Sequence, residues 1–576
     1  MKKVIIASSA TNAKLHEPDT ELKLAAQKIL SYAVQGAEHV MSFKTGAWDG
    51  RSSFFDYKSA TFPAGFVHYL SAALRQQGYE VSLVRKPRPA PLGPEKPVVD
   101  KFGDDPRYDY QPDIVQRLVK HGQMIAQVAT GGGKSRIAKM VYARIGRPML
   151  FLTTRSILMY QMKTAFERDM GVNVSVLGDG QFGHTIVRED GTEQRAIKKV
   201  CVGMVQTLAA RLEEKTVQGE IERLADLRVA REVRLVSQLR TKLKGQPTKA
   251  IEAQCRELDK RLVSERLTAA QMTAKASDTV AAHNIERQKT IKVLSMFELV
   301  IGEEAHEISG SSYYNILKHC NNAHYRLALT ATPFMKDDEE SNMRLMAAFG
   351  PIGARVTEKT LIDRGILAAP HFKIVPLPAK IPKLHRMTAW QSAYRIGIVD
   401  CEQRNAAIVK ECIRAKEYAL PTLVLINQTK HGDVLLELLR AAGVVASFIQ
   451  GEDDQPERQS ALHRLAKGEI DVLIGSTILD VGVDVPAIGM VILAGGGKAE
   501  VALRQRIGRG AREKKVGPNI VLIVDFADDG NQHLKSHALQ RQAIIKATDG
   551  FHQNLLPIGQ DFDFDAMGLQ VGGFGV

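Results

Sequence analysis

The chain has 576 residues, of which 44% are hydrophobic and 25% are charged; these values exclude a disordered or fibrous protein. At roughly 100–200 residues per domain, the length predicts three or four domains. The net charge of +14 favours a polyanionic partner, although charge alone does not separate nucleic acid from an anionic membrane surface.

The five cysteines have neither CxxC nor zinc-ligand spacing, which predicts reduced thiols in a cytosolic protein. No apolar run approaches the length of a membrane span, and the patch Val4 to Ile6 is too short for a signal peptide. We therefore expect a cytoplasmic protein that makes no membrane contact.

The first 84 residues predict a small α+β domain. We expect a strand near Lys3–Ile6, a helix over about 20–33, short strands within 40–58, a helix near 64–77 and a strand over 80–84. The segment RKPRPAPLGPEKP, residues 85–97, has five prolines in thirteen positions and opens an extended, semi-stiff linker over 85–99.

Short apolar runs then alternate with helical segments, a pattern that predicts parallel sheets covered on both faces. Runs such as MIAQVAT, PMLFLTT, KVCVGMV, FELVIGEE and YRLALTAT fall within 100–350, and TLVLINQ, VVASFIQG, IDVLIGST, GMVILAGG and NIVLIVDF within 351–530. The expected fold class is α/β, with two successive α/β domains at 100–350 and 351–530. A helix and a loosely ordered tail should fill 531–576.

Residues 212–290 break the alternation, because they are rich in Lys, Arg, Glu and Leu and have almost no strand signal. Leucines at helical spacing stop at Gly245 and Pro247 and then resume, which predicts a hairpin of two antiparallel helices inserted in the first α/β domain. The hairpin is either an arm that meets branched nucleic acid or a protein partner, or a solvated pair that packs on itself.

The segment ATGGGKS, Ala129–Ser135, lies between a predicted strand and a predicted helix. A glycine-rich turn there directs several backbone N–H groups and a helix N-terminus at one anion. Lys134 would reach the β- and γ-phosphates of a nucleotide, and Ser135 would offer its hydroxyl to Mg²⁺. The alternative is a chance glycine-rich turn.

Two adjacent acids, Glu303 and Glu304, end the apolar run FELVIGEE. A carboxylate at the end of such a strand can hold Mg²⁺ near a triphosphate, and a second one can polarise the attacking water. We assign the metal role to Glu303 and the catalytic role to Glu304. Taken alone, two surface glutamates after a strand are the commoner explanation.

A third segment, QRIGRGAR, carries Arg509 and Arg512 three positions apart. On one helical face, both would point at phosphate charge from a second domain, as arginine fingers do. Two solvated arginines on a basic helix are the alternative.

In this order and spacing, these segments resemble the motif set of superfamily two helicases and translocases, over roughly 105–530. The resemblance implies two tandem RecA-like domains, with ATGGGKS as motif I, EEAH as a DEAH-type motif II and TAT (Thr330–Thr332) as motif III. Glu303 departs from the family, which usually has Asp there. The implied nucleotide contacts are Gln111, which matches an adenine-reading glutamine, together with Thr130, Gly131, Gly132, Gly133, Lys134, Ser135, Gly482 and Asp484.

Nucleic-acid contacts follow from the same resemblance. TTR (Thr153–Arg155) looks like motif Ia, VQT (Val205–Thr207) like the next backbone-contacting motif, and Thr477 opens motif V. The implied contacts are Thr154, Arg155, Gln206, Thr207 and Thr477.

The segment FKTGAWDGRSSFFDY, Phe43–Tyr57, with FPAGFVHYL and GYEV after it, resembles the accessory domain of UvsW-like phage branch-migration helicases. Trp48 and Arg51 would stack on bases or grip phosphates there. Trp48 anchoring a small core beside a tight Asp49-Gly50 turn is an equal alternative.

These resemblances imply an ATP- and Mg²⁺-dependent DNA helicase that remodels forks, R-loops or recombination junctions, in the 3′ to 5′ direction, in a phage-infected or bacterial cytoplasm. The partners would be single-stranded and branched duplex DNA. The alternatives are a nucleotide-gated DNA-binding switch, a restriction-type motor whose nuclease is on another chain, and an RNA helicase.

Overall fold

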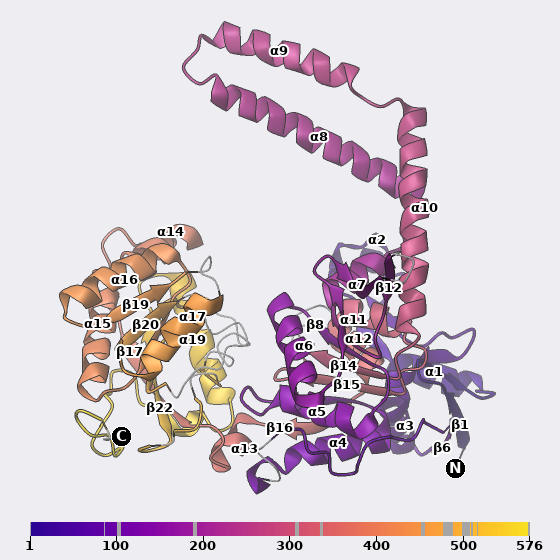
Figure 1. The fold of residues 1–576 in the computed structure, drawn as a ribbon, viewed down its shortest axis with the longest axis horizontal. Coiled ribbons are helices and arrows are strands. Elements are labelled where there is room, and N and C mark those ends of the chain that lie inside the picture. The colour runs from indigo at the N-terminus through magenta and orange to yellow at the C-terminus, as the bar shows by residue number, and fades with distance from the viewer. Residues whose placement is uncertain are drawn as a thin grey trace.

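The computed structural model describes residues 2–85, 87–100, 105–187, 193–305, 310–334, 338–378, 380–450, 455–475, 488–497, 507–508, 511–514 and 516–573. These residues form two parallel sheets in separate lobes, a small mixed sheet at the N-terminus and a long helical arm (Figure 1). No helix within the described ranges is long and apolar enough to cross a membrane.

The N-terminal module has a four-stranded sheet in the order β5-β2-β1-β6 within the described residues. Its elements are β1 (Lys3–Ser8), β2 (Asn12–Leu15), α1 (Thr20–Ile29), β3 (Ser31–Ala33), α2 (Met41–Lys44), β4 (Arg51–Ser53), β5 (Thr61–Pro63), α3 (Val67–Gln76) and β6 (Glu80–Arg85). The expected helix over 20–33 ends at Ile29, because residues 31–33 pair with β4 instead.

The first large sheet has the order β10-β9-β13-β8-β14-β15-β7-β16 in the described part of the chain. All of its strands are parallel except β10, which runs antiparallel to β9. The strands are β7 (Gln123–Val128), β8 (Met149–Thr153), β9 (Val174–Gly178), β10 (Gln181–Phe182), β13 (Val200–Met204), β14 (Leu299–Glu303), β15 (Tyr325–Thr330) and β16 (Ile352–Val356). Because β16 pairs with β7, this sheet extends past residue 350, the expected domain end.

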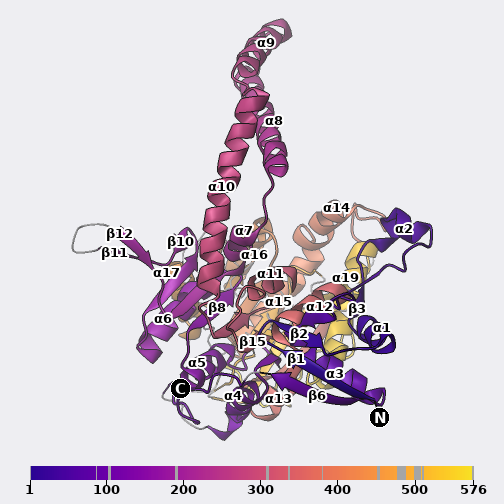
Figure 2. The same cartoon turned by 90° about the vertical axis from the view of Figure 1, so that its right-hand side faces the viewer.

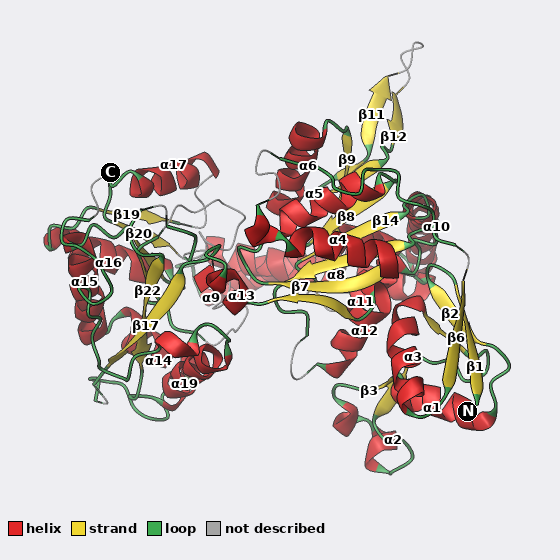
Figure 3. Cartoon of the chain, turned by 90° about the horizontal axis from the view of Figure 1, so that it is seen from below, coloured by secondary structure: helices red, strands yellow, loops and turns green. Residues whose placement is uncertain are grey.

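Helices cover both faces of this sheet (Figure 3). One face packs on α4 (Tyr110–His121), α5 (Lys134–Ile145) and α6 (Ser156–Met170), and the other on α7 (Val205–Leu212), α11 (Gly310–Leu317) and α12 (Glu339–Phe349). Along β14, Leu299 and Ile301 face the first layer and Val300 faces the second. A strand buried on both faces has to be apolar throughout, as the sequence predicts.

The second lobe contains a six-stranded parallel sheet among the described residues, in the order β17-β22-β21-β18-β20-β19. The strands are β17 (Ala369–Pro376), β18 (Thr422–Leu425), β19 (Ala446–Ile449), β20 (Val472–Gly475), β21 (Met490–Ile492) and β22 (Ile520–Ala527). α17 (Gln455–Ala466) and α19 (Gln532–Ala547) pack on one face, and α15 (Glu402–Glu417) and α16 (Thr429–Ala441) on the other. α13 (Glu358–Asp363) joins the two lobes, and α14 (Trp390–Tyr394) lies near α19. The expected α/β class is confirmed.

The inserted segment forms three helices, not two: α8 (Val217–Lys242), α9 (Thr248–Ser264) and α10 (Ala269–Leu294). A capping box between Thr268 and Gln271 begins the third helix, which the leucine spacing did not predict. In Figures 1 and 2, α10 rises from the first lobe. In Figure 1, α8 and α9 lie next to each other and extend to one side of α10. β11 (His184–Val187) and β12 (Glu193–Ala196) form a separate hairpin.

The proline-rich linker is bound to the first lobe over much of its length. Leu92 and Gly93 donate backbone hydrogen bonds to the last turn of α5, and Tyr325 donates its hydroxyl to the carbonyl of Pro89 at 2.7 Å. Arg88 donates to the carbonyls of Lys120 and His121 at the end of α4. The described linker residues 87–99 form no helix or strand, and the linker is held as a strap rather than free to act as a spacer.

The N-terminal module shares one continuous apolar core with the first lobe. Phe54 packs edge-on against Tyr314, with ring centroids 5.8 Å apart. A Cβ at Gly65 would lie 2.2 Å from the carbonyl oxygen of Met346, so this glycine allows two backbones to touch. The module has its own sheet, but apolar packing against the first lobe holds it in place.

The expectation of a loosely ordered C-terminal tail is wrong for the described residues up to 573. Phe562, Phe564 and Leu569 are buried in the core of the second lobe, and Phe564 stacks on Tyr418 at 4.3 Å. Lys373 forms ion pairs with Asp561 and Glu411. Three large apolar side chains in a polar segment give the tail enough buried surface to hold it in place.

Candidate functional site

The glycine-rich turn lies where the sequence predicts it, between the end of β7 and the start of α5. Lys134 is the first residue of α5, and Gly133 before it has a φ of +79°. Gly131 has a φ of +89°, another backbone conformation that side chains other than glycine rarely adopt. Alternating handedness of this kind turns successive N–H groups toward one point, the arrangement that binds phosphate.

Lys134 and Glu304 form an ion pair, with 3.1 Å between Nζ and Oε1, and each side chain is about nine-tenths buried. Glu304 follows β14, and β15 lies between β14 and β7 in the sheet. Both residues therefore extend from the carboxyl edge of the sheet, where parallel α/β folds place their ligands. Glu304 has a φ of +48°, and its N–H donates to the carbonyl of Leu329 at 3.0 Å. That bond fixes the acid beside β15.

Ser135 and Glu303 line the same pocket beside α5 and α6. A side-chain hydroxyl and one buried carboxylate suit Mg²⁺, which usually keeps several waters and takes its other ligands from a nucleotide's phosphates. No cluster of three or more His, Cys, Asp or Glu side chains placed to hold a metal occurs in the described ranges. The residues present fit a Mg²⁺ ion that binds together with a nucleotide.

Gln111 is fully buried, and its amide is directed at the phosphate-binding turn rather than at solvent. Its Nε2 donates to the carbonyl of Gly132 at 3.2 Å, and the hydroxyl of Tyr110 donates to the same oxygen at 2.8 Å. The Oε1 of Gln111 accepts from Arg136, whose guanidinium also pairs with Asp100 at 2.7 Å. This series of contacts holds the turn in place. No pattern in the sequence had indicated a role for Tyr110, Arg136 or Asp100.

The second lobe touches the phosphate-binding turn. A Cβ added to Gly508 would lie 2.9 Å from the Cβ of Thr130, and one added to Gly131 would lie 2.6 Å from Leu367 Cδ2. Arg107 also pairs with Glu513 at 2.8 Å across the two lobes. Motif I and the segment QRIGRGAR, far apart in sequence, are therefore neighbours.

The expected helical placement of Arg512 is wrong. Its backbone forms an antiparallel bridge with Leu367, and the neighbouring Ala368 donates its N–H to the carbonyl of Ala511 at 2.8 Å. The chain that enters β17 thus holds this segment in an extended form. Arg509, Gly482, Asp484 and Thr477 lie outside the described residues.

Thr154 and Gln206 are brought together by strand register. β8 and β13 are parallel neighbours in which Thr153 lies opposite Met204, so the residues that follow both strands emerge side by side. Gln206 Nε2 donates to the carbonyl of Thr154 at 2.8 Å. Arg155 caps the start of α6, and Thr207 lies in the first turn of α7. The four predicted contacts of the first lobe thus form one patch.

Trp48 and Arg51 have partners within the protein. The indole Nε1 of Trp48 donates to the carbonyl of Arg51 at 2.7 Å. The guanidinium of Arg51 pairs with Glu339 on α12 at 3.0 Å and donates to the carbonyl and hydroxyl oxygens of Ser31. This arrangement supports an anchoring role for Trp48, the alternative that the sequence left open, and it engages Arg51 within the protein as well.

The chain matches two protein families. Residues 106–226 and 225–335 match the family described as "Type III restriction enzyme, res subunit", and residues 404–514 match "Helicase conserved C-terminal domain". Together these regions span more than half of the chain and include the strands of both parallel sheets except β16, β17 and β22. The chain belongs to the superfamily two helicases.

Several known proteins are similar to parts of the chain. Putative helicase 22 of Sulfolobus islandicus filamentous virus is 26% identical over 236 residues, which are 39% of this chain and 41% of that protein. The pre-mRNA-splicing ATP-dependent RNA helicase PRP28 of Cryptococcus neoformans var. neoformans is 28% identical over 135 residues, 23% of this chain and 18% of that protein. The chain thus spans less than half the length of these relatives.

Among solved structures, that of UvsW from bacteriophage T4 aligns with 96% of this chain and 99% of its own, at 17% identity and a TM-score of 0.41.

Proposed function

We propose that this protein is a nucleic-acid-dependent ATPase that acts as a DNA helicase or translocase on forks, R-loops and recombination junctions. The observation that carries the proposal is the meeting of three parts at one place: the phosphate-binding turn, the Lys134–Glu304 pair and Gly508 of the second lobe. A nucleotide bound there would contact both lobes when they are closed and only the first lobe when they are open.

ATP would supply the reactive γ-phosphoryl group, and Mg²⁺ would offset the charge of its phosphates. Lys134 and Ser135 hold the phosphate end from the start of α5. When Lys134 turns toward phosphate, it releases Glu304 Oε1, which then accepts a hydrogen bond from water and orients it for attack. Glu303 contributes a carboxylate to the metal site. Gln111 reading adenine stays a prediction, since its amide binds the turn in this structure.

Opening and closing of the lobes would convert hydrolysis into movement. Arg509 and Arg512 would reach the phosphates from the second lobe, and Gly482 and Asp484 would contact the nucleotide from motif V. Loss of the γ-phosphate removes a partner for the arginines, so the lobes separate. This cycle of contact and release is the proposed motor.

The nucleic-acid strand would cross the patch formed by Thr154, Arg155, Gln206 and Thr207 and continue to Thr477. Contacts of this type bind the sugar-phosphate backbone and ignore base sequence, which suits movement along a strand. We propose DNA as the substrate, 3′ to 5′ polarity, a role in recombination and repair, and a cytoplasmic setting in a phage-infected or bacterial cell. The helical arm would meet a protein partner.

An RNA helicase is the second candidate, and the similarity to an RNA helicase named PRP28 favours it. The backbone contacts of the first lobe discriminate sugars weakly. A nucleotide-gated switch that binds DNA without separating strands would use the same residues.

The test is the steady-state ATPase rate without nucleic acid and with single-stranded DNA, duplex DNA, a four-way junction or single-stranded RNA. Lys134→Ala serves as the blank, and Lys120→Ala, an exposed lysine on the neighbouring helix, as the matched control. We expect the greatest stimulation by branched DNA and a loss of about 100-fold or more in Lys134→Ala. Stimulation by RNA alone would identify the protein as an RNA helicase. An ATPase rate that no nucleic acid changes would overturn the proposed motor function.

Strand displacement with hydrolysable and non-hydrolysable ATP then separates the helicase from the switch. A switch binds DNA in both conditions and displaces no strand.

A further inference from the structure

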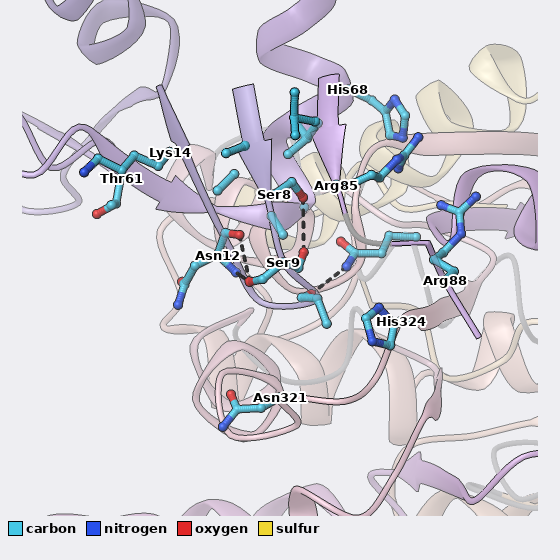
Figure 4. Close-up of a pocket in the computed structure, with 18 of the residues that line it drawn as sticks. Ser8, Ser9, Asn12, Lys14, Thr61, His68, Arg85, Arg88, Asn321 and His324 are labelled. Carbon is cyan, nitrogen blue, oxygen red and sulfur yellow. Dashed lines mark hydrogen bonds between the residues drawn. The ribbon is translucent and has the colours of Figure 1, made fainter. Parts of the chain in front are cut away.

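A second pocket lies at the seam between the N-terminal module and the first lobe (Figure 4). Its volume is about 610 Å³, within the usual range of about 300–1,000 Å³ for small-molecule sites. The walls come from the β1–β2 turn, the start of α3, the end of β6, the linker and the loop before β15.

The pocket is on the opposite edge of the sheet from the proposed ATP site. Gln123, which begins β7, lines the pocket, whereas the phosphate-binding turn follows the other end of the same strand. A strand of this length spans about 20 Å at about 3.3 Å per residue. The pocket therefore cannot be part of the nucleotide site already described.

The charge of the lining is one-sided. Its described residues include Lys14, His68, Arg85, His121 and His324, and none of the lining residues is Asp or Glu. Figure 4 shows His68, Arg85, Arg88 and His324 along one side and Lys14 with Thr61 on the other. Burial lowers the pKa of all three histidines, so Lys14, Arg85 and Arg88 carry the positive charge. A cavity bordered by cations without a carboxylate selects an anion.

The cations of this pocket have different roles. Arg88 is committed to the carbonyls at the end of α4, so it contributes charge and holds the wall. Arg85 ends β6 and is exposed, and neither Arg85 nor Lys14 forms an ion pair within the described residues. Arg85 is thus the side chain best placed to bind an anion directly.

The rest of the lining suits a flat organic group. Its apolar members are all small and include Ala7, Ala10, Ala13, Ala64 and Val67. Gln123 Nε2 donates to the carbonyl of Ala10 at 2.8 Å, which ties the module's turn to the first lobe across the pocket. A ligand with an anionic group and a compact apolar part would therefore match the cationic and the apolar sides of this cavity.

We propose that the seam pocket is a second, non-catalytic site for a nucleoside monophosphate unit, with its phosphate beside Arg85 and its base against the small apolar residues of the lining. The unit is either a free nucleotide or the 5′-phosphorylated end of a nucleic-acid strand. The site goes beyond the motor function and stands whether or not the chain separates strands.

Calorimetric titration tests the site, with saturating ADP and Mg²⁺ present to fill the proposed ATP site. The probes are AMP, a 5′-phosphorylated dinucleotide and the same dinucleotide with a 5′-hydroxyl. The variants are Arg85→Glu and, as a matched control on the same module, Lys58→Glu, which changes an exposed lysine outside the pocket. Binding and ATP hydrolysis are measured separately, so a failure of one does not decide the other.

We expect a phosphorylated probe to bind at least tenfold more tightly than the 5′-hydroxyl probe, and Arg85→Glu to remove that advantage while Lys58→Glu keeps it within twofold. AMP binding as well as the dinucleotide assigns the site to free nucleotides, and binding of the dinucleotide alone assigns it to strand ends. Equal binding of all three probes, or equal losses in both variants, would overturn the proposal. If Arg85→Glu does not fold, Asn321→Asp adds a carboxylate to the lining at an exposed position and serves in its place.

Proton uptake gives an independent readout. Burial lowers the pKa of His68, and the charges of Arg85 on β6, His121 on α4 and Arg88 on the linker lower it further. A phosphate bound among these cations opposes their effect and raises that pKa, so binding should strengthen as the pH falls from 8 to 6. In wild type the measured enthalpy should then vary with the ionisation enthalpy of the buffer, and His68→Gln should reduce that variation. A constant enthalpy would remove His68 from the phosphate's surroundings.

Discussion

Lys134 and Glu304 meet because they follow parallel strands of one sheet, so their side chains leave the same edge. Each of them alone in a largely buried position would be costly, since a buried charge without a partner destabilises the fold. Paired, they keep a cation and a carboxylate ready beside the phosphate-binding turn. Because the two side chains touch, the proposed nucleotide would change both residues at once.

The buried amide of Gln111 couples Asp100, the residue that follows the linker, to the same turn. Asp100 holds Arg136, Arg136 holds Gln111, and Gln111 holds the carbonyl of Gly132. Removing the charge of Asp100 should keep the shape of the side chain and weaken its contact with Arg136.

Asp100→Asn should raise the KM for ATP by about 5- to 30-fold and change kcat by less than twofold. A hydrogen bond to a charged group contributes about 1–2 kcal/mol, and this one positions the turn without touching the reacting atoms. Steady-state kinetics over a range of ATP concentrations give both constants, with Asp113→Asn, an exposed acid on α4, as the control. An unchanged KM would show that Asp100 does not position the turn.

At the scale of elements, the linker strap depends on one close approach. A Cβ at Gly93 would lie 1.8 Å from the carbonyl oxygen of Ala143 on α5. Gly93 also donates to Arg144, and Arg144 returns a hydrogen bond to its carbonyl. Any side chain at this position must push the strap away from α5.

Gly93→Ala should therefore reduce the free energy of unfolding by about 1–3 kcal/mol, the usual cost of overpacking. Urea unfolding followed by circular dichroism measures the change. Glu95→Ala, in the same strap with an exposed side chain, is the control and should differ little from wild type. If the two variants unfold at the same urea concentration, the strap is not held at Gly93.

The helical arm contacts the first lobe at its base. Arg211 pairs with Glu286, Arg287 donates to the carbonyl of Leu212, and His283 bonds to the carbonyl of Glu213. Farther out, apolar side chains remain exposed, including Val233 at 64%. Helices that bury so little apolar surface add little to the stability of the lobe.

Replacing residues 224–272 by a short Gly-Ser linker should thus lower the melting temperature by less than about 4 °C, the shift expected for a loss near 1 kcal/mol in a protein of this size. The ATPase rate without nucleic acid should stay within twofold of wild type. Differential scanning fluorimetry and the ATPase assay check both. A large loss of stability would instead show that the arm is part of the core.

At the scale of the whole molecule, the two lobes meet at the phosphate-binding turn and along the chain that joins them. Gly508 lies against Thr130, while Arg364 pairs with Asp109 and Arg107 pairs with Glu513. The absence of a side chain at Gly508 lets the second lobe approach the turn this closely. A larger residue there would hold the lobes apart.

Gly508→Val should lower the ATP turnover number by about tenfold or more, because closure brings the second lobe to the phosphates. Binding of single-stranded DNA to the first-lobe patch should persist, as fluorescence anisotropy would report. Ala441→Val, at an exposed site of the second lobe, is the control. Full turnover in Gly508→Val would exclude this contact from the catalytic cycle.

The packing of the N-terminal module on the first lobe limits which experiments can test the role of the module. Because it shares an apolar core with the first lobe, deleting residues 1–84 would expose α11 and α12 as well as remove any nucleic-acid contact. Point substitutions at Trp48 or Arg51 separate the two effects better than a truncation does.

The sequence by itself determined the class of fold and the local chemistry. Strands buried on both faces must be continuously apolar, so runs such as those of β7, β14 and β22 are visible without a structure. The phosphate-binding turn needs glycines, a lysine and a hydroxyl at fixed spacing, so motif I is local as well. The positions of Lys134, Ser135, Glu303 and Glu304 at strand and helix ends followed from these patterns.

Only the tertiary structure decided which distant segments touch. The brace from Asp100 to Gly132, the contact of Gly508 with Thr130 and the seam pocket each join residues with no shared periodicity. The same reason explains the errors: the tail is ordered by the hydrophobic pocket that its phenylalanines fill, and Arg512 is extended because β17 begins beside it. Local patterns specify elements, whereas contacts between elements depend on packing that no short window of sequence contains.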